Sequence, residues 1–112
     1  MKFIRLYTGD DGETHCEERD VTEAPDLPGP QDAARVSFNV AQPGRFSDWH
    51  PAPRRQFVIT LAGEAEIGLK DGTKYRLKAG DINLAEDVTG GGHTTRVVSD
   101  VPRITVQIPL AD

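Results

Sequence analysis

Apolar and polar residues alternate along most of the chain after residue 34, in short runs that are separated by Gly and Pro residues. Such alternation is the pattern of a β-strand with one buried and one solvated face. The strands predicted in this way span residues 35–41, 56–62, 64–69, 74–78, 81–85, 94–98 and 103–110. Short strands at this close spacing, without a helical period, predict an all-β sandwich or small barrel.

The alternation also predicts which side chains point into the core. Val36, Phe38 and Val40 form the apolar face of the first predicted strand. Ile82 and Leu84 are expected to point inward from a later strand. Because an antiparallel sheet commonly buries one face and leaves the other solvated, these apolar faces are predicted to be the buried ones.

Charge divides the chain into two parts. The 112 residues carry a formal net charge of −5. Residues 1–32 hold three basic and nine acidic residues, a net charge of −6, whereas residues 33–112 have a net charge of +1. We therefore expect one domain, in which an irregular, acidic N-terminal arm over residues 1–32 precedes a barrel over residues 33–112. A solvated arm is the favoured interpretation, and an acidic docking surface is the alternative.

Composition excludes several classes of function. The single cysteine, Cys16, can form neither an internal disulfide nor a CxxC or zinc-ribbon site. An acidic chain without a run of Lys or Arg is unsuited to general nucleic-acid binding. The longest uncharged apolar stretch, residues 57–62, is far too short to span a bilayer, and the N-terminus lacks the apolar region of a signal peptide. We expect a cytoplasmic protein with no nucleic-acid and no membrane partner.

Two histidines follow turn signals within the predicted barrel. His50 comes six residues after Gly44, and His93 closes a loop of three consecutive glycines at residues 90–92. On an extended chain, Gln56 would share the face of His50. Two imidazoles and one amide are therefore the main candidates for chemistry in this region.

Aromatic and basic residues cluster around His50. Trp49 and Phe57 are candidates for the wall of a small-ligand site, with core packing or an oligomer contact as the alternative. Arg45, Arg54 and Arg55 bring three guanidinium groups to the same region, where they could bind a carboxylate or phosphate. The alternative for the arginines is a solvated face, or pairing with the acidic arm.

The spacing around His50 resembles the first sequence motif of the cupin superfamily. Gly44, His50 and Gly63 stand at motif positions. Ala52 occupies the place of the second motif histidine, and Gln56 occupies the place of the motif glutamate. The match therefore keeps the turns and the first ligand of the motif but replaces the other two polar positions.

The second cupin motif has a weaker counterpart further along the chain. Gly80 begins it, Glu86 and Val88 stand where the motif has Pro and Gly, and His93 comes two residues late. The resemblance covers about residues 36–108. It implies a double-stranded β-helix, the jelly-roll barrel of the cupins, and in many cases a dimer.

The resemblance also implies a metal site. Cupin barrels commonly hold a divalent metal with three histidines and one glutamate from the motif positions, and the corresponding residues here are His50, Gln56 and His93. Two imidazoles suit several divalent transition metals. Replacing the carboxylate by an amide removes the anionic ligand, and Glu86 or Asp87 could restore one. The alternatives are hydrogen-bonded histidines in a polar barrel mouth, or histidines that bind an organic ligand without metal.

Two classes of function follow. The first is a cupin that binds a small molecule, which would be anionic if the nearby arginines contact it. By analogy with other cupins, this protein would also hold a divalent metal and have an oxygenase or isomerase activity. The second is a non-catalytic binding or interaction module, since Ala52 and Gln56 resemble the erosion of a catalytic metal site. No catalytic residue is assigned. We expect a homodimer, because so short a chain would otherwise expose apolar strand edges.

Overall fold

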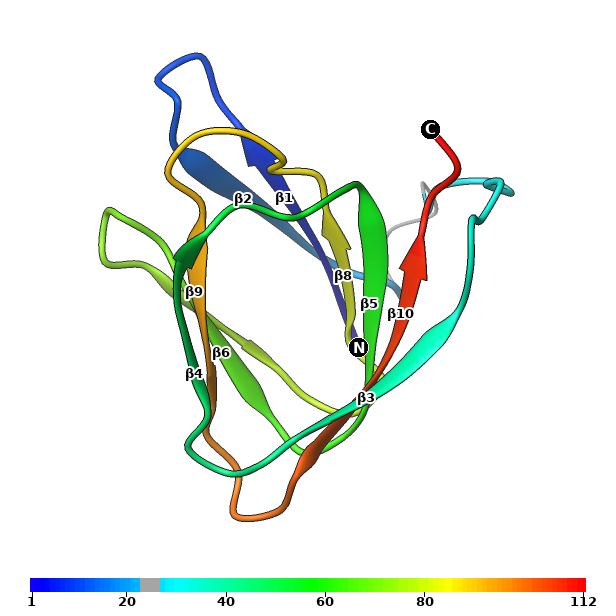
Figure 1. The fold of residues 1–112 in the computed structure, drawn as a ribbon, viewed down its shortest axis with the longest axis vertical. Helices are drawn as coiled ribbons and strands as arrows, with labels where there is room; N and C mark the ends of the chain where they lie inside the picture. The colour runs from blue at the N-terminus through cyan, green and yellow to red at the C-terminus, as the bar shows by residue number, and fades with distance from the viewer. Residues whose placement is uncertain (23–26) are drawn as a thin grey trace.

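The computed structural model describes residues 1–22 and 27–112, and this part of the chain is all-β (Figure 1). It contains no helix long and apolar enough to cross a membrane. A six-stranded sheet has the order β2-β1-β8-β5-β10-β3, and a four-stranded sheet has the order β4-β9-β6-β7. The strands are β1 (Lys2–Thr8), β2 (Thr14–Asp20), β3 (Ser37–Ala41), β4 (Phe46–His50), β5 (Gln56–Ala62), β6 (Ala65–Gly68), β7 (Lys74–Leu77), β8 (Ile82–Ala85), β9 (His93–Val97) and β10 (Arg103–Pro109).

The two sheets face each other and enclose the interior of a barrel (Figure 1). Neighbouring strands pair antiparallel, except for β1 and β8, which run parallel. The expected all-β barrel is confirmed. Seven strands lie within two residues of the predicted ranges. Most of them alternate between polar and apolar residues, and β5 is a short run that is apolar on both faces, as expected for a strand inside a sandwich.

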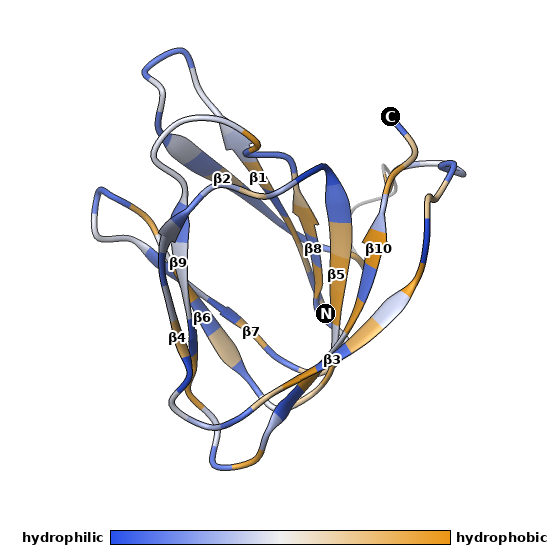
Figure 2. Ribbon diagram, in the orientation of Figure 1, coloured by the Kyte–Doolittle hydropathy of each residue, from blue (hydrophilic) through white to orange (hydrophobic). Residues whose placement is uncertain are grey.

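The first predicted strand is correct in position but wrong in orientation. Phe38 and Val40 of β3 are 69 % and 58 % exposed, and Val36 before the strand is 57 % exposed. Asn39, between them, borders the barrel interior instead. Alternation separates two faces of a strand but does not say which one faces inward. On β3 the apolar side chains therefore face outward, and Figure 2 shows hydrophobic and hydrophilic residues along the strands of the six-stranded sheet.

Strand β8 shows the same reversal. Ile82 and Leu84 pack on the outer face against Phe3 and Leu110, and do not point inward as expected. Asn83, which the alternation would have turned to solvent, is 5 % exposed and lines the interior. The six-stranded sheet is thus covered by an apolar outer cluster, while its inner face is partly polar.

The acidic N-terminal segment differs from the expected irregular arm. Lys2–Thr8 and Thr14–Asp20 form two strands of the six-stranded sheet. Ile4 and Leu6 are fully buried, which anchors β1 in the barrel. Three of the acidic residues of this segment, Glu17, Glu18 and Asp20, lie on β2, an edge strand on which these side chains are exposed. Part of the expected irregular connection over residues 20–34, including Glu23 and Asp26, lies outside the described residues.

One part of the barrel interior is filled by apolar side chains. Ile4 and Leu6 of β1 meet Ile67, Leu69 and Leu77 from the opposite sheet, and each of these side chains is buried. Ile67, which is 2 % exposed, therefore points inward from β6. The remaining interior, between β5, β8 and β10 on one side and β4 and β9 on the other, is polar and incompletely filled.

Candidate functional site

A cavity of about 240 Å³ lies between the two sheets. Side chains from both sheets line it, and His50, Gln56 and His93 are among them. The fold therefore brings the three residues implied as metal ligands into one cavity. Ala52, at the position of the missing cupin histidine, also faces it.

The two histidines are neighbours across strands β4 and β9. His50 pairs with His93 in the register, and their ring centroids are 4.7 Å apart with the ring planes inclined by 57°. Gly92 makes this approach feasible: its φ is +75°, and a Cβ at this position would overlap the carbonyl group of His50. The last glycine of the triple-glycine loop thus has a geometric role in bringing the histidines together.

Buried hydrogen bonds fix the orientation of His93. Its Nδ1 lies 2.6 Å from Oδ2 of Asp87, and the Thr14 hydroxyl donates to the same oxygen at 2.8 Å. All three residues are buried, with Asp87 fully inaccessible. Because a carboxylate only accepts hydrogen bonds, Nδ1 of His93 carries the hydrogen. In the neutral ring, Nε2 is then left with a free lone pair.

His50 is held in the same tautomer by a different partner. Its Nδ1 lies 2.6 Å from the backbone carbonyl oxygen of Asp48, which can only accept a hydrogen bond. Nε2 of the neutral His50 ring is therefore also unprotonated. A histidine whose Nδ1–H is bonded to a carbonyl or carboxylate is the usual form of a metal ligand or of a hydrogen-bond acceptor for a substrate.

The donor set fits only a weak metal site. Among residues 1–22 and 27–112 no three side chains of His, Cys, Asp or Glu are placed to hold one metal ion. The two imidazoles and the Gln56 amide are neutral donors. Glu86 does not restore the missing anion, because it forms ion pairs with Arg5 and Arg55. Asp87 does not restore it either, because its Oδ2 is hydrogen-bonded to Nδ1 of His93.

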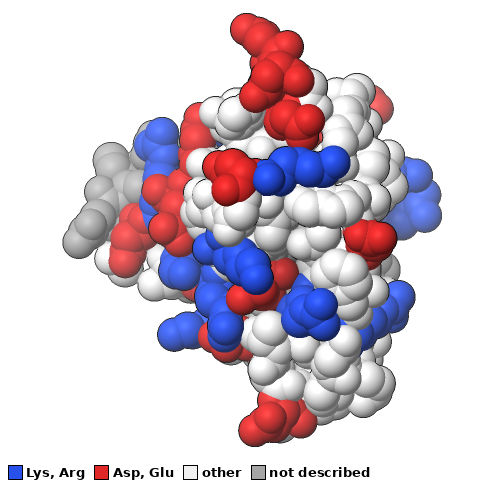
Figure 3. All heavy atoms as spheres, turned by 90° about the vertical axis from the view of Figure 1, so that its left-hand side faces the viewer, with Lys and Arg blue, Asp and Glu red and all other residues white. Residues whose placement is uncertain are grey.

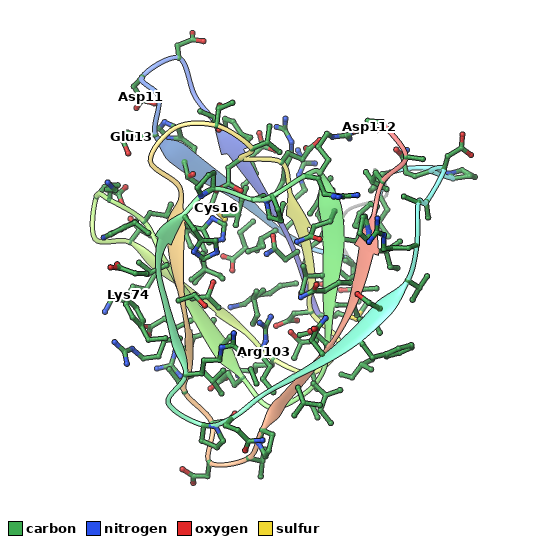
Figure 4. All side chains as sticks on the ribbon, viewed as in Figure 1. Asp11, Glu13, Cys16, Lys74, Arg103 and Asp112 are labelled. Carbon is green, nitrogen blue, oxygen red and sulfur yellow. The ribbon has the colours of Figure 1, made fainter. Side chains whose placement is uncertain are left out.

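Arg103 at the start of β10 is a cavity residue that the sequence analysis missed. Its side chain lies between the two sheets (Figure 4), is 8 % exposed, and donates from Nη2 to Oγ1 of Thr60 at 3.0 Å. Its Nε has no hydrogen-bond partner among the described residues. Burial lowers the pKa of the guanidinium to about 10. Alternation places Arg103 on the face of β10 opposite to Ile104 and Val106, but it does not say which of the two faces points inward.

Asn83 of β8 is a second missed residue. It is 5 % exposed, lines the cavity, and its Oδ1 is buried without a hydrogen-bond donor in the described part of the chain. Buried polar atoms are nearly always paired in folded proteins. The cavity wall thus presents an unpaired acceptor in addition to the unpaired Nε of Arg103.

The aromatic residues expected to contact a ligand lie elsewhere. Trp49 is 43 % exposed on the outside of the four-stranded sheet, where the Lys70 ammonium lies 4.7 Å from the ring centroid. Phe57 packs in the apolar cluster outside the six-stranded sheet. Both are adjacent in sequence to cavity residues, and strand alternation turns them to the opposite face.

Two of the three arginines expected to bind a ligand do not line the cavity. Arg54 is exposed. Arg55 forms ion pairs with Glu86 at 2.7 Å and with Asp112 at 2.5 Å. Together with Phe57, it borders a second hollow, of about 260 Å³, on the outer face of the six-stranded sheet. The third, Arg45, lines the cavity and is exposed.

Solved structures with the same fold identify the class of protein. An uncharacterized conserved protein with a double-stranded β-helix domain from Klebsiella pneumoniae is 26 % identical, with a TM-score of 0.53 over 75 % of this chain and 81 % of that one. A cupin superfamily protein from Desulfitobacterium hafniense is 20 % identical, with a TM-score of 0.55 over 75 % of this chain and 72 % of that one. A cupin domain from Bordetella pertussis is 18 % identical, with a TM-score of 0.55 over 78 % and 88 %.

These likenesses agree with the motifs. The chain is a double-stranded β-helix protein. Its fold is that of the solved cupin structures, and the double-stranded β-helix that the resemblance of Gly44, His50, Gly63 and His93 to the cupin motifs implied is confirmed. Comparison with protein-family models and with curated proteins gave no match.

Proposed function

We propose that the protein binds a small molecule in the cavity between its two sheets. The observation that carries this proposal is a polar cavity of about 240 Å³ whose wall holds two oriented imidazoles and two unpaired polar groups. A cavity of about 150 Å³ can hold benzene, so this volume suits a ligand of one ring or a short chain with polar substituents. Such a ligand would pair with wall groups that are otherwise costly to bury.

The histidines are proposed to bind the ligand through their Nε2 atoms. Asp87 and the Asp48 carbonyl hold the two rings so that these lone pairs are available. Nε2 of His93 would accept a hydrogen bond from a ligand O–H or N–H, and could remove that proton if the protein is an enzyme. The buried Asp87 would stabilise the imidazolium that such a transfer forms.

The same pair is also the proposed place for a divalent transition metal. His50 and His93 would supply imidazole nitrogens, and Gln56 would supply its amide oxygen. A bound ion would polarise a ligand oxygen. The Asp87 carboxylate would keep His93 in the ligating orientation. Since the donors are neutral, we expect weak binding that favours metals suited to imidazole.

Elemental analysis of tag-free protein after reconstitution with manganese, iron or zinc tests the metal proposal. The expected result is a metal content that disappears in the His50→Ala/His93→Ala double variant. If the wild-type protein contains no more metal than the double variant, the metal proposal is wrong and the proposal of ligand binding stands.

Thermal-shift screening tests ligand binding, because a compound that binds only the folded state raises the melting temperature. We expect at least one small polar compound whose effect falls in His50→Ala and in His93→Ala. No stabilising compound, or effects unchanged in both variants, contradicts the proposal. Product formation or oxygen consumption that His50→Ala abolishes would assign an enzyme, whereas binding without turnover would assign the non-catalytic module.

A further inference from the structure

The cavity contains a positive charge that no described carboxylate neutralises. Arg103 is 8 % exposed, and it donates a hydrogen bond to the neutral hydroxyl of Thr60 at 3.0 Å. No Asp or Glu side chain in the described part of the chain lies within ion-pair distance of it, and none lines the cavity. We propose that Arg103 is a carboxylate-binding subsite, and that the ligand of this protein is a small monocarboxylate.

The surroundings of Arg103 hold it in a fixed position. Thr60 is fully buried on the adjacent strand β5, and its hydroxyl oxygen accepts a hydrogen bond from Nη2 of Arg103. The turn after β5 packs directly on its backbone: Gly63 has φ +75°, and a Cβ there would lie 2.7 Å from Cα of Arg103. A guanidinium placed in this way retains Nε–H and further N–H groups, which can form the paired hydrogen bonds that a carboxylate accepts.

The charge balance favours a singly charged ligand. The wall contains one buried cation, since the other arginine that lines it, Arg45, is exposed. A monocarboxylate would leave no net charge at Arg103, whereas a dianion such as hydrogen phosphate would bury an unbalanced negative charge. The cost of leaving the guanidinium without an anion is visible in its pKa, which burial lowers to about 10.

Asn83 adds a second requirement to the ligand. Its Oδ1 is buried without a hydrogen-bond donor in the described part of the chain, and the residue lines the same cavity. A carboxylate that also carries an O–H or N–H group would pair with both Arg103 and Asn83. Hydroxy- and amino-substituted monocarboxylates are therefore expected to bind more tightly than the unsubstituted acids of the same size.

This inference rests on the proposed function, and paired probes separate the two. The full chain is titrated with a set of small monocarboxylates, benzoate and lactate among them, each matched by its neutral carboxamide, and with inorganic phosphate. We expect carboxylates to raise the melting temperature, and carboxamides and phosphate to have little effect. If the carboxamides bind as well as the carboxylates, the Arg103 subsite is wrong but the proposed function stands. If phosphate binds more strongly than the carboxylates, the choice of a carboxylate is wrong. If none of the compounds binds, both the subsite and the proposed function are wrong.

A matched pair of variants tests the residue. Arg103→Met should weaken carboxylate binding by roughly 30-fold or more, as expected for loss of a buried charge partner. Arg35→Met removes an equal charge from an exposed position and should leave the affinity unchanged. The Nε–H resonance of Arg103 in the wild-type protein should shift on titration, which tests the contact even if Arg103→Met does not fold. An unshifted resonance, or undiminished binding in Arg103→Met, overturns the subsite.

Discussion

Single side chains at the cavity wall are arranged for a partner that the fold itself does not supply. Arg103 and Asn83 each keep one buried polar atom without a hydrogen-bond partner in the described part of the chain. The Oδ1 atom of Asp87 is also buried and unpaired there, while its Oδ2 atom is bonded to His93 and Thr14. Each such atom costs stability, because it has lost water without gaining another hydrogen bond. Two residues with such atoms, Arg103 and Asn83, line one cavity, and they mark the polar part of the barrel interior as the place where chemistry is expected.

The tautomer of His93 depends on Asp87 and gives the first prediction. In Asp87→Asn the new side chain can donate through its amide to Nδ1, so the hydrogen of the neutral ring should move to Nε2. Two-bond proton–nitrogen correlation spectra distinguish the tautomers directly. We expect the Nδ1–H form in the wild-type protein and the Nε2–H form in the variant.

His50 serves as the internal control for that experiment. Its Nδ1 contacts the backbone carbonyl of Asp48, which Asp87→Asn leaves unchanged. Its tautomer should therefore be the same in both proteins. An unchanged His93 tautomer would show that the Asp87 contact does not orient the ring.

Part of this residue-level picture could be predicted from the sequence. Turn spacing and the cupin resemblance correctly grouped His50, Gln56 and His93 around one cavity. The Asp87–His93 contact and the position of Arg103 were missed, because they depend on how strands β8, β9 and β10 curve around the interior. Spacing along one strand carries no information about such contacts between strands.

At the scale of elements, strands with a polar and an apolar face were predicted well, and the others were missed. Strand β2 has few buried residues after Thr14, so it has no apolar face that alternation could reveal. Strand β4 carries exposed aromatic residues on one side and a half-buried histidine on the other. In β1, by contrast, Phe3 packs outward and Ile4 packs inward, so both faces are apolar and the period is lost.

The loop before β9 gives the second prediction, through two adjacent glycines. Gly92→Ala would place a Cβ onto the His50 carbonyl in a backbone conformation with φ of +75°. We expect it to destabilise the protein by about 3 kcal/mol or more, since both strain and backbone overlap act. Gly91→Ala meets only the flexible ends of Glu13 and Lys70, and should cost less than about 1 kcal/mol. Urea unfolding of both variants measures the difference, and equal losses would refute the role of Gly92.

The third prediction concerns Glu86, which joins β1 to the entry of β5. Its oxygens accept hydrogen bonds from Arg5 at 2.5 Å and from Arg55 at 2.7 Å. Burial opposes its ionisation, but the two guanidinium groups outweigh this effect and lower its pKa below the usual 4.5. Glu86→Gln should reduce the free energy of unfolding at neutral pH by about 1–2 kcal/mol.

The pH dependence of that loss follows from the sign of the pKa shift. A carboxyl whose pKa is lowered by folding stabilises the fold above pH 4.5 and loses this contribution as the pH falls through the folded-state pKa. The gap between wild type and Glu86→Gln should therefore narrow in acid. Glu17→Gln, which removes an exposed partner of the same Arg5, should cost less than about 0.5 kcal/mol. Chemical unfolding across pH measures both, and a gap that widens below pH 4.5 would contradict the account.

At the scale of the whole molecule, the outer faces of the two sheets have opposite character. Figure 3 shows basic and acidic side chains interspersed on the side formed by the four-stranded sheet. Arg76 pairs there with Glu64 and Glu66, and Lys74 pairs with Glu66. The outer face of the six-stranded sheet instead presents exposed apolar side chains on β3 and β5, namely Phe38, Val40 and Leu61. A contact that excludes water is therefore favoured on the second face, whereas the exposed Phe46 and Trp49 rings of the four-stranded sheet lie against the cationic groups of Arg96 and Lys70.

This asymmetry gives the last prediction, a homodimer formed through the six-stranded sheet. Strand β3 is an edge strand, and its Phe38 and Val40 side chains are 69 % and 58 % exposed, so a second copy would cover both the edge and the apolar face. Sedimentation velocity should give twice the 12.2 kDa mass of the chain, and Phe38→Glu should return it to the monomer because a charge would be buried at the contact.

Phe46 provides the matched control for this experiment. It is 45 % exposed on the four-stranded sheet, where the Arg96 guanidinium lies 4.4 Å from its ring centroid. Phe46→Glu introduces the same charge on the opposite side of the barrel and should leave the dimer intact. If both variants dissociate, the charge acts through the fold rather than at the contact. If only Phe46→Glu dissociates, the four-stranded sheet forms the interface, and the apolar face of the six-stranded sheet needs another explanation.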